Sequence, residues 1–387
     1  MSDFIPLSVP SIRGNEWKYI KECLDTEWVS SAGKYVSLFE KRIAEYTGVR
    51  HSVAVMNGTA ALHISLMLSG VKDGDEVIVP TLTFISPINA VRYVNAFPVF
   101  MDADEFYNMD NVRVIQFIRE ETVFRDGFSW NKMTGRRVSA IIPVHIFGNA
   151  VWLDDLIEEC KQRNIKVIED ATEALGTRYL RGKFKGKHTG TVGDFGCLSF
   201  NGNKIITTGG GGIILTNNEE LADRARYLTT QAKDDEVRYI HDEVGFNYRL
   251  TNIQAALGVA QLEQLPEYIR IKKQNYFYYK DKIEATSGLT LAEMPDYADN
   301  NHWLYSLQID SATYGKDREA LMKHLSDHQI QTRPVWYLNH LQKPYRQFQA
   351  YQIDHAYHLV ENTLNIPSSV RLSTREVDRI IKILGGS

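Results

Sequence analysis

The sequence has little cysteine. Among its 387 residues only Cys23, Cys160 and Cys197 occur, and they lie far apart. Such spacing fits neither a disulfide framework nor a paired CxxC metal site, so we expect three free thiols. His51 and His63 also lack metal-ligand spacing with cysteine or with His188, and we expect no metal site.

The chain also lacks a long apolar run. The richest candidate, residues 140–153, contains Pro143, His145, Gly148 and Asn149 and is shorter than the roughly 18 residues of a membrane span. The N-terminal residues MSDFIPLSVPSIRG do not read as a secretion signal. We therefore expect a cytoplasmic protein with no membrane partner.

The sequence also lacks a large excess of either charge. The sequence has 44 Lys and Arg against 48 Asp and Glu, a net charge of -4. No general basic surface is available for nucleic acid, so we expect no nucleic-acid partner, although a local anion site remains possible. Hydrophobic residues make up 43% and charged residues 24%, which is typical of an ordinary folded protein.

Between residues 51 and 232, short β-rich runs alternate with helical stretches. This pattern predicts an α/β fold with a mostly parallel sheet covered on both faces. Strands rich in Val and Ile are expected at 52–55, 76–79, 97–101, 140–144 and 166–168, with helices at 59–68 and 153–163.

The pattern changes beyond residue 190. Two β-rich segments, 192–200 and 211–215, flank a glycine run, and a helix is expected at 219–232. A long helical stretch follows at 252–283, which we expect to be kinked or broken at Pro266. Ser373 and Glu376 form a capping box before a last helix. We predict a large domain over 1–255 and a smaller C-terminal α+β domain over 256–387, entered by the long helix.

The segment SFNGNKIITTGGGG, residues 199–212, places Lys204 near two hydroxyls and four consecutive glycines. Glycines let a backbone pass close to a flat ligand or an anion. A lysine in such a partly dry setting becomes a usable amine nucleophile. By itself, the segment fits a surface lysine beside a flexible turn equally well.

Asp170 follows the strand expected to end at Ile168. Ligands of doubly wound sheets bind at the carboxyl ends of the strands, so Asp170 lies where chemistry usually occurs. A buried carboxylate there keeps the ring nitrogen of a pyridine-type cofactor protonated. Taken alone, a helix-capping role for Asp170 is the more common case.

Two further strand ends carry candidate binding groups. Gly58, Thr59 and Ala60 begin a helix after the first strand, where exposed amides and the helix dipole suit a phosphate, although an ordinary cap looks the same. Phe84 follows the next strand and is placed either to stack on a planar ring or to fill the core.

Together these four segments resemble the sugar-nucleotide aminotransferase family, which uses pyridoxal 5'-phosphate and has the aspartate-aminotransferase fold (fold type I). The resemblance covers nearly the whole chain, and SFNGNKIITTGGGG is its most specific part. Many family members carry Glu in place of Gly210 or Gly211. That difference touches a turn and not the chemistry.

The resemblance implies a role for each matching residue. Lys204 would bond the cofactor covalently and later move the substrate proton, and Asp170 would pair with the pyridine nitrogen. Glu173 stands where relatives often have Gln or His near the cofactor's 3-hydroxyl, so it is either protonated there or has another role. The remaining positions that the resemblance assigns are Gly58, Thr59, Ala60 and Ser199 at the phosphate, Phe84 on the ring, and Asn247, which would reach the phosphate of the neighbouring subunit in a homodimer.

Lys204 also excludes the related dehydratases, in which histidine replaces the lysine. Stretches such as PVHIFGN, NYRLTNIQAA and RPVWYLNHLQKPY are similar to family members of the legionaminic-acid type. This likeness implies amination at C4 of a nucleotide-linked 2-acetamido-4-keto-6-deoxyhexose, with glutamate as donor, in surface-polysaccharide or nonulosonic-acid biosynthesis. It leaves GDP and UDP open.

On the same likeness, Trp28, Arg333 and His340 would contact the sugar nucleotide, and His145 is equally suited to a structural role or to a substrate contact. The alternatives are a C3 aminotransferase and a non-catalytic protein that only binds a phosphate or a nucleotide. The second needs neither Lys204 nor Asp170, and no GxxxxGK[ST] or GxGxxG motif supports it.

Overall fold

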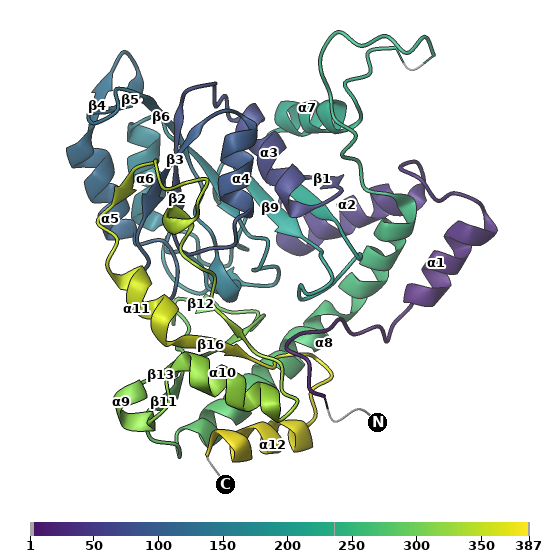
Figure 1. The fold of residues 1–387 in the computed structure, drawn as a ribbon. Helices are drawn as coiled ribbons and strands as arrows, with labels where there is room; N and C mark the ends of the chain where they lie inside the picture. The colour runs from purple at the N-terminus through teal and green to yellow at the C-terminus, as the bar shows by residue number, and fades with distance from the viewer. Residues whose placement is uncertain (1–3, 236, 386–387) are drawn as a thin grey trace.

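The computed structural model describes residues 4–235 and 237–385. Its larger part is built around a ten-stranded sheet with the order β1-β10-β9-β7-β6-β2-β3-β15, extended by the β4–β5 hairpin (Figure 1). Pairing is parallel from β9 through β7, β6, β2 and β3 to β15, and antiparallel at β10 and β1. The predicted α/β class with a mostly parallel sheet is confirmed. The strands are β1 (His51–Val55), β2 (Glu76–Pro80), β3 (Phe97–Met101), β4 (Thr122–Arg125), β5 (Phe128–Asn131), β6 (Arg137–Ile141), β7 (Lys166–Asp170), β9 (Phe195–Ser199), β10 (Gly212–Thr216) and β15 (Ala350–Tyr351).

Both faces of this sheet are covered. In β2 the side chains of Val77 and Val79 belong to one hydrophobic cluster, whereas Ile78 belongs to a second cluster with Val138 and Val167. Because successive side chains of a strand point to opposite faces, these two clusters are the two cores of a doubly covered sheet. The helices of this part are α1 (Glu16–Asp25), α2 (Lys34–Thr47), α3 (Gly58–Leu68), α4 (Ser86–Tyr93), α5 (Asn111–Gln116), the π-helix η1 (Phe117–Glu121), the 3-10 helix η2 (Ile146–Gly148), α6 (Asp154–Gln162) and α7 (Glu219–Thr229).

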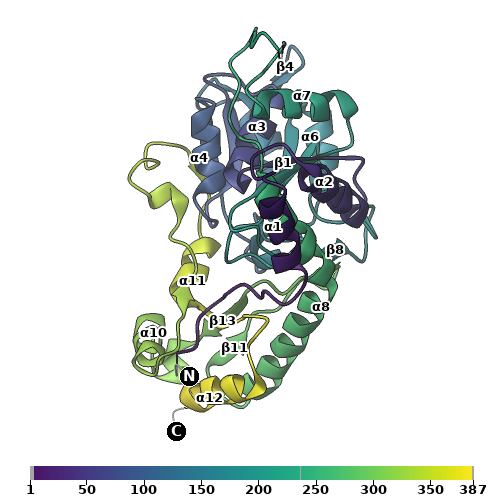
Figure 2. The ribbon, with the colours of Figure 1, turned by 90° about the vertical axis from the view of Figure 1, so that its right-hand side faces the viewer.

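The long helix α8 (Asn252–Ile283) runs from the first sheet to a second one, as Figures 1 and 2 show. A capping box of Thr251 and Gln254 begins it. Of the kink or break expected at Pro266, the break is wrong, because the helix continues through this residue. Proline removes one helical hydrogen bond, but Leu265 and Tyr268 on either side of Pro266 in the sequence are packed into the core.

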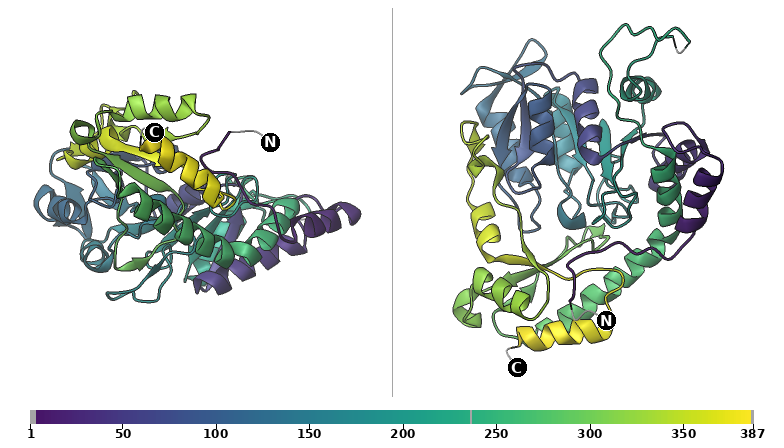
Figure 3. Two further views of the ribbon diagram at one scale, coloured as in Figure 1. Left: turned by 90° about the horizontal axis from the view of Figure 1, so that it is seen from below. Right: turned by 45° about the vertical axis from the view of Figure 1, so that its right-hand side comes forward.

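The second sheet has four strands in the order β11-β13-β16-β14 and its own core, which includes Tyr276, Leu307, Leu325 and Ile380 (Figure 3). Ile5, near the N-terminus, packs into that core. The division at residues 255 and 256 stays a prediction. The elements here are β11 (Leu289–Leu291), β13 (Tyr305–Ile309), α9 (Ser311–Tyr314), α10 (Arg318–Asp327), β14 (Arg333–Pro334), the 3-10 helix η3 (Asn339–Leu341), α11 (His355–Asn362), β16 (Thr363–Ile366) and α12 (Thr374–Leu384); β8 (Arg178–Tyr179) and β12 (Ala298–Asp299) pair separately.

Several element ends differ from the sequence-based expectation. β6 ends at Ile141 and not at residue 144, because Pro143 cannot donate to a ladder. α7 ends at Thr229, since Gln231 and Ala232 have left-handed backbones, with φ of 71° and 49°. The β4–β5 hairpin was missed, although Asp126 and Gly127 form the Asp-Gly signal of a two-residue turn. The predicted capping box of Ser373 and Glu376 is confirmed.

The cysteines are free and buried. Within the described residues, no helix combines the length and the apolar character that a membrane crossing requires.

Candidate active site

A cavity of about 500 Å³ lies at the carboxyl ends of the central strands. It is lined from β9, from the start of α3 and from loops of both parts of the chain. Six of the predicted site residues line it: Gly58, Thr59, Phe84, Glu173, Ser199 and Lys204. Widely separated segments of the sequence therefore meet at one place, as the predicted sheet requires.

Lys204 follows β9 and has only 13% of its side chain exposed. Its Nζ lies 3.4 Å from Oε1 of Glu173 and 4.2 Å from the centroid of the Trp303 ring. Gly210 and Gly211 also line the cavity. The lysine is thus a largely buried amine at a cavity wall and not the surface lysine of the alternative.

Glu173 is buried beside this amine. Its Oε2 accepts a hydrogen bond from the backbone N–H of Phe147 at 2.9 Å. Burial raises the pKa of the Glu173 carboxyl to about 7, although Lys204 and the Phe147 N–H oppose this rise. Near neutral pH the side chain therefore exists in both its protonated and its ionised form.

Asp170 is the last residue of β7 and is 2% exposed. Its Oδ1 accepts a hydrogen bond from the N–H of Thr172 at 3.0 Å. Burial raises the pKa of the Asp170 carboxyl, while the hydrogen bonds from Thr172 and the charge of Lys204 lower it. Asp170 begins no helix here, because residues 172–176 form turns, so the helix-capping alternative has no helix to cap.

His145 lies behind Asp170 and is completely buried. Its Nε2 is 3.0 Å from Oε2 of Glu169, and its Nδ1 accepts the N–H of Val151 at 3.0 Å. Both ring nitrogens of His145 are bonded inside the protein. Of the two roles that the sequence left open, a structural role and a substrate contact, the structure therefore supports the structural one.

The start of α3 forms one end of the cavity. Asn57 caps the helix through a hydrogen bond from the N–H of Ala60 to its side chain at 2.8 Å. A Cβ at Gly58 would lie 2.9 Å from the Thr172 methyl carbon and 3.0 Å from Cβ of Ser199, so this wall leaves no room for a side chain. Such a helix start with small residues suits a phosphate. The predicted phosphate contact of Ala60 is not tested, and Ala60 does not line the cavity.

Aromatic rings also line the cavity. Phe84 is 53% exposed, and its ring centroid lies 6.5 Å from that of Trp336. Trp336 stacks on Phe147 at 5.0 Å and lines the cavity. Trp303 was not recognised at all, because no local pattern marks it as a neighbour of Lys204.

Four other predicted residues lie away from this cavity within the chain. Trp28 is 59% exposed and lines a separate hollow beside α2, and Arg333 lies exposed on the second sheet. His340 donates to or accepts from Thr81 through Nδ1 at 2.6 Å. The side chain of Asn247 is exposed beyond α7. Their predicted contacts with substrate or with a partner subunit are not tested.

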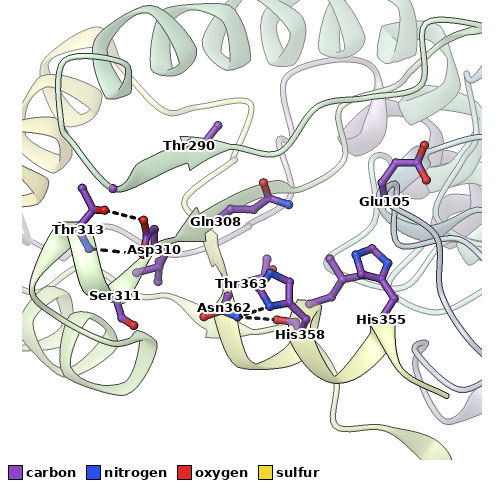
Figure 4. A pocket seen from close by; sticks show the side chains of 13 residues that line it. Glu105, Thr290, Gln308, Asp310, Ser311, Thr313, His355, His358, Asn362 and Thr363 are labelled. Carbon is purple, nitrogen blue, oxygen red and sulfur yellow. Dashed lines mark hydrogen bonds between the residues drawn. The ribbon is translucent and has the colours of Figure 1, made fainter.

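A second hollow, of about 550 Å³, lies between α11 and the second sheet (Figure 4). His355 and His358 face it from α11, and Asp310 lines the opposite side, where it accepts hydrogen bonds from Thr313. None of the predicted site residues lines this hollow. In the part of the chain that the structure describes, no group of three or more His, Cys, Asp or Glu side chains is placed to hold a metal.

The geometry at Lys204 agrees with a comparison of the whole chain with known families. The model of the DegT/DnrJ/EryC1/StrS aminotransferase family matches residues 10–385. The chain belongs to this family. It is an aminotransferase, and its cofactor is pyridoxal phosphate, as the sequence predicted.

Curated relatives cover nearly the whole chain. A GDP-perosamine synthase of Caulobacter vibrioides is 38% identical over an alignment of 389 positions that covers 99% of this chain and 99% of its own. The putative pyridoxal phosphate-dependent aminotransferase EpsN of Bacillus subtilis is 35% identical over 98% of this chain and 95% of its own.

A solved structure confirms the fold. DesI, determined in the presence of its TDP-sugar product, superposes with a TM-score of 0.87 at 27% identity, over 100% of this chain and 93% of DesI. The family match and this superposition confirm the predicted aspartate-aminotransferase type of fold. The closer likeness to legionaminic-type members is not tested and stays a prediction.

Proposed function

We propose that this enzyme transfers an amino group to C4 of a nucleotide-linked 4-keto-6-deoxyhexose that bears a 2-acetamido group, with glutamate as the amino donor. Its place would be surface-polysaccharide or nonulosonic-acid biosynthesis of the legionaminic type. The observation that carries the amino-transfer part is the largely buried amine of Lys204, 3.4 Å from Glu173 in a cavity that begins at the N-terminus of α3.

The residues present fit pyridoxal phosphate. When bound, this group supplies an electron sink for the carbon that exchanges its amine. Gly58, Thr59, Ala60 and Ser199 would hold the phosphate, where the wall at Gly58 leaves no room for a side chain. Phe84 would lie against the ring.

Three side chains would hold or transfer protons around the cofactor ring. The buried carboxylate of Asp170 would keep a proton on the ring nitrogen. Glu173, whose pKa is raised to about 7, can donate a hydrogen bond to the ring hydroxyl in its protonated form. Lys204 would move the proton to and from the substrate carbon.

The enzyme would act as a homodimer. Asn247 has an exposed side chain and does not line the cavity of its own chain, which leaves it available to a neighbouring subunit. Trp28, Arg333 and His340 would contact the sugar nucleotide. For these four residues the support is the family resemblance.

The acceptor is the least constrained part. Two relatives, at 38% and 39% identity, are named GDP-perosamine synthases. Their names favour GDP over UDP as the nucleotide of the acceptor. A site built to pair an acetamido group rejects analogues that lack it, because its own polar groups then stay unsatisfied. The preference between acetamido and hydroxyl acceptors therefore tests the proposal directly.

The experiment offers GDP- and UDP-linked 4-keto-6-deoxy sugars, each with a 2-acetamido or a 2-hydroxyl group, to the purified enzyme with glutamate and pyridoxal phosphate. Products are identified by mass spectrometry, and their amination site by NMR. We expect amination at C4 with the acetamido acceptor preferred. A preferred 2-hydroxyl acceptor, or transfer at C3, would refute the acceptor, and no amination of any sugar would refute the function.

A further inference from the structure

Lys204 has two contacts that come from different parts of the chain. Glu173 approaches its Nζ from the loop after β7, at 3.4 Å. The ring of Trp303, from the segment before β13, lies 4.2 Å away on another side. A protonated amine over an indole face is attracted by the ring quadrupole, and tryptophan is the best of the aromatic partners.

Trp303 is held firmly in this place. It is 2% exposed, and its indole Nε1 donates to the carbonyl of Asn203 at 2.7 Å, directly beside Lys204. Its carbonyl accepts the hydroxyl of Ser368 at 3.1 Å. Because the ring is anchored to the residue before Lys204, the indole face and the amine keep a fixed relation.

Asn301 connects the two contacts. Its buried side chain accepts the N–H of Trp303 through Oδ1 at 3.0 Å. Its Nδ2 donates to the carbonyl of Glu173 at 2.8 Å and to that of Leu175 at 3.0 Å. One amide thus ties the Trp303 segment to the loop that carries Glu173.

In an amino-transfer cycle the lysine is bonded to the cofactor at some times and free at others. Its free amine would take a proton from one substrate carbon, carry it as an ammonium, and then return it. We propose that Trp303 is a catalytic residue that stabilises the protonated free amine of Lys204, and that Asn301 is the positioning residue that sets Trp303 and Glu173 on this amine. The proposal rests on the proposed role of Lys204 as the reacting amine.

The carboxyl groups around Lys204 do not fully neutralise its ammonium charge, so the Trp303 ring has a separate stabilising role. Glu173 faces Nζ directly, and Asp170 interacts with it at longer range. Glu173 is partly protonated near neutral pH, so it does not hold a full negative charge there. The indole face attracts the cation at every pH and supplies what the carboxyl lacks.

The test measures the amine itself and not turnover. The full-length chain, prepared without cofactor, is methylated with formaldehyde and cyanoborohydride at a series of pH values, and the peptide containing Lys204 is quantified by mass spectrometry. This reaction labels only the neutral amine. Loss of the ring destabilises the protonated form, so we expect Trp303→Leu to shift the labelling midpoint about one pH unit lower.

Two variants make the result specific. Trp303→Phe keeps a weaker π face and should shift the midpoint by less in the same direction. Trp336→Leu removes an indole from the same cavity that does not lie over Lys204, and it should leave the midpoint unchanged. An unchanged midpoint in folded Trp303→Leu, or an equal shift in Trp336→Leu, would overturn the proposal. If Trp303→Leu does not fold, an unchanged midpoint in Trp303→Phe would do the same.

Asn301→Ala tests the positioning role. We expect its labelling midpoint to shift in the direction seen for Trp303→Leu, and kcat to fall more than KM rises. Lower thermal stability with an unchanged midpoint would show that Asn301 is only structural. A wrong sugar acceptor would leave all labelling results as they are, so failure of the acceptor assignment and failure of this proposal are distinguishable.

Discussion

His145 and Glu169 form a completely buried pair, with Nε2 of the histidine 3.0 Å from Oε2 of the glutamate. Glu169 also accepts the N–H groups of Gly190, Val192 and Gly193. Burial raises the pKa of the Glu169 carboxyl, but the hydrogen bond from His145 and those from the backbone N–H groups outweigh it and lower the pKa overall. The pair fixes the end of β7, whose last residue is Asp170.

His145→Phe should therefore lower the free energy of unfolding, because it leaves the buried carboxylate short of a donor and the Val151 N–H without its acceptor. We expect a loss of about 3 kcal/mol, measured by urea denaturation. The matched control is His358→Phe, since His358 is an exposed histidine on α11. An equal effect of both changes would contradict the structural role of the pair.

If Lys204 is the reacting amine, Lys204→Ala should abolish the visible absorption of the cofactor-bound protein and reduce turnover by several orders of magnitude, because none of the other described residues that line the cavity is a lysine. Lys343→Ala, at an exposed position, should change neither. Absorption spectra and the amination assay measure both effects. Wild-type turnover in Lys204→Ala would show that another residue is the nucleophile.

Asp170→Asn should reduce kcat more than it weakens cofactor retention. The amide fills the same buried space but cannot hold a proton on the ring nitrogen. The measurement compares kcat at saturating pyridoxal phosphate with the dissociation constant of the cofactor. If only the dissociation constant changed, Asp170 would be a binding residue alone.

Glu173→Gln should change how stability depends on pH. Burial raises the pKa of Glu173 from 4.5 to about 7, so the folded chain binds more protons than the unfolded chain between these values. This contribution to stability is present below pH 4.5 and is lost as pH rises through 7. Relative to the variant, the wild type should lose up to about 3 kcal/mol from pH 4.5 to 8.

Urea denaturation of both cofactor-free chains at several pH values measures this difference. The exposed Glu361→Gln is the matched control and should show no such trend. A stability difference between wild type and Glu173→Gln that stays constant with pH would mean that Glu173 remains ionised in the folded chain.

Mixing Lys204→Ala with Asn247→Ala subunits should restore part of the activity. If Asn247 reaches the neighbouring site, one of the two sites in each mixed dimer has both residues intact. The assay compares each inactive variant alone with the mixture, after mass spectrometry has verified subunit exchange. Absence of recovery would mean that Asn247 acts within its own chain.

The sequence alone determined the α/β class and most of the strands of the large sheet. Their Val- and Ile-rich runs, such as β2, are buried on both faces and need no partner to be recognised. It also singled out Lys204 and Asp170, because residue type and position at a strand end are visible locally, and the structure shows both to be largely buried near one cavity. The capping box of Ser373 and Glu376 was readable for the same reason, since these two residues bond within one turn.

Tertiary structure decided what depends on contacts between distant segments. Trp303 and Lys204 are about a hundred positions apart, and no periodicity relates them. α8 also continues through Pro266 where the neighbouring Leu265 and Tyr268 are packed into the core, and local propensity does not contain such packing. Likewise, His145 could be assigned to the interior only when Glu169 and Val151 were seen on its two nitrogens, because hydrogen-bond partners across a fold are not written in the neighbouring residues.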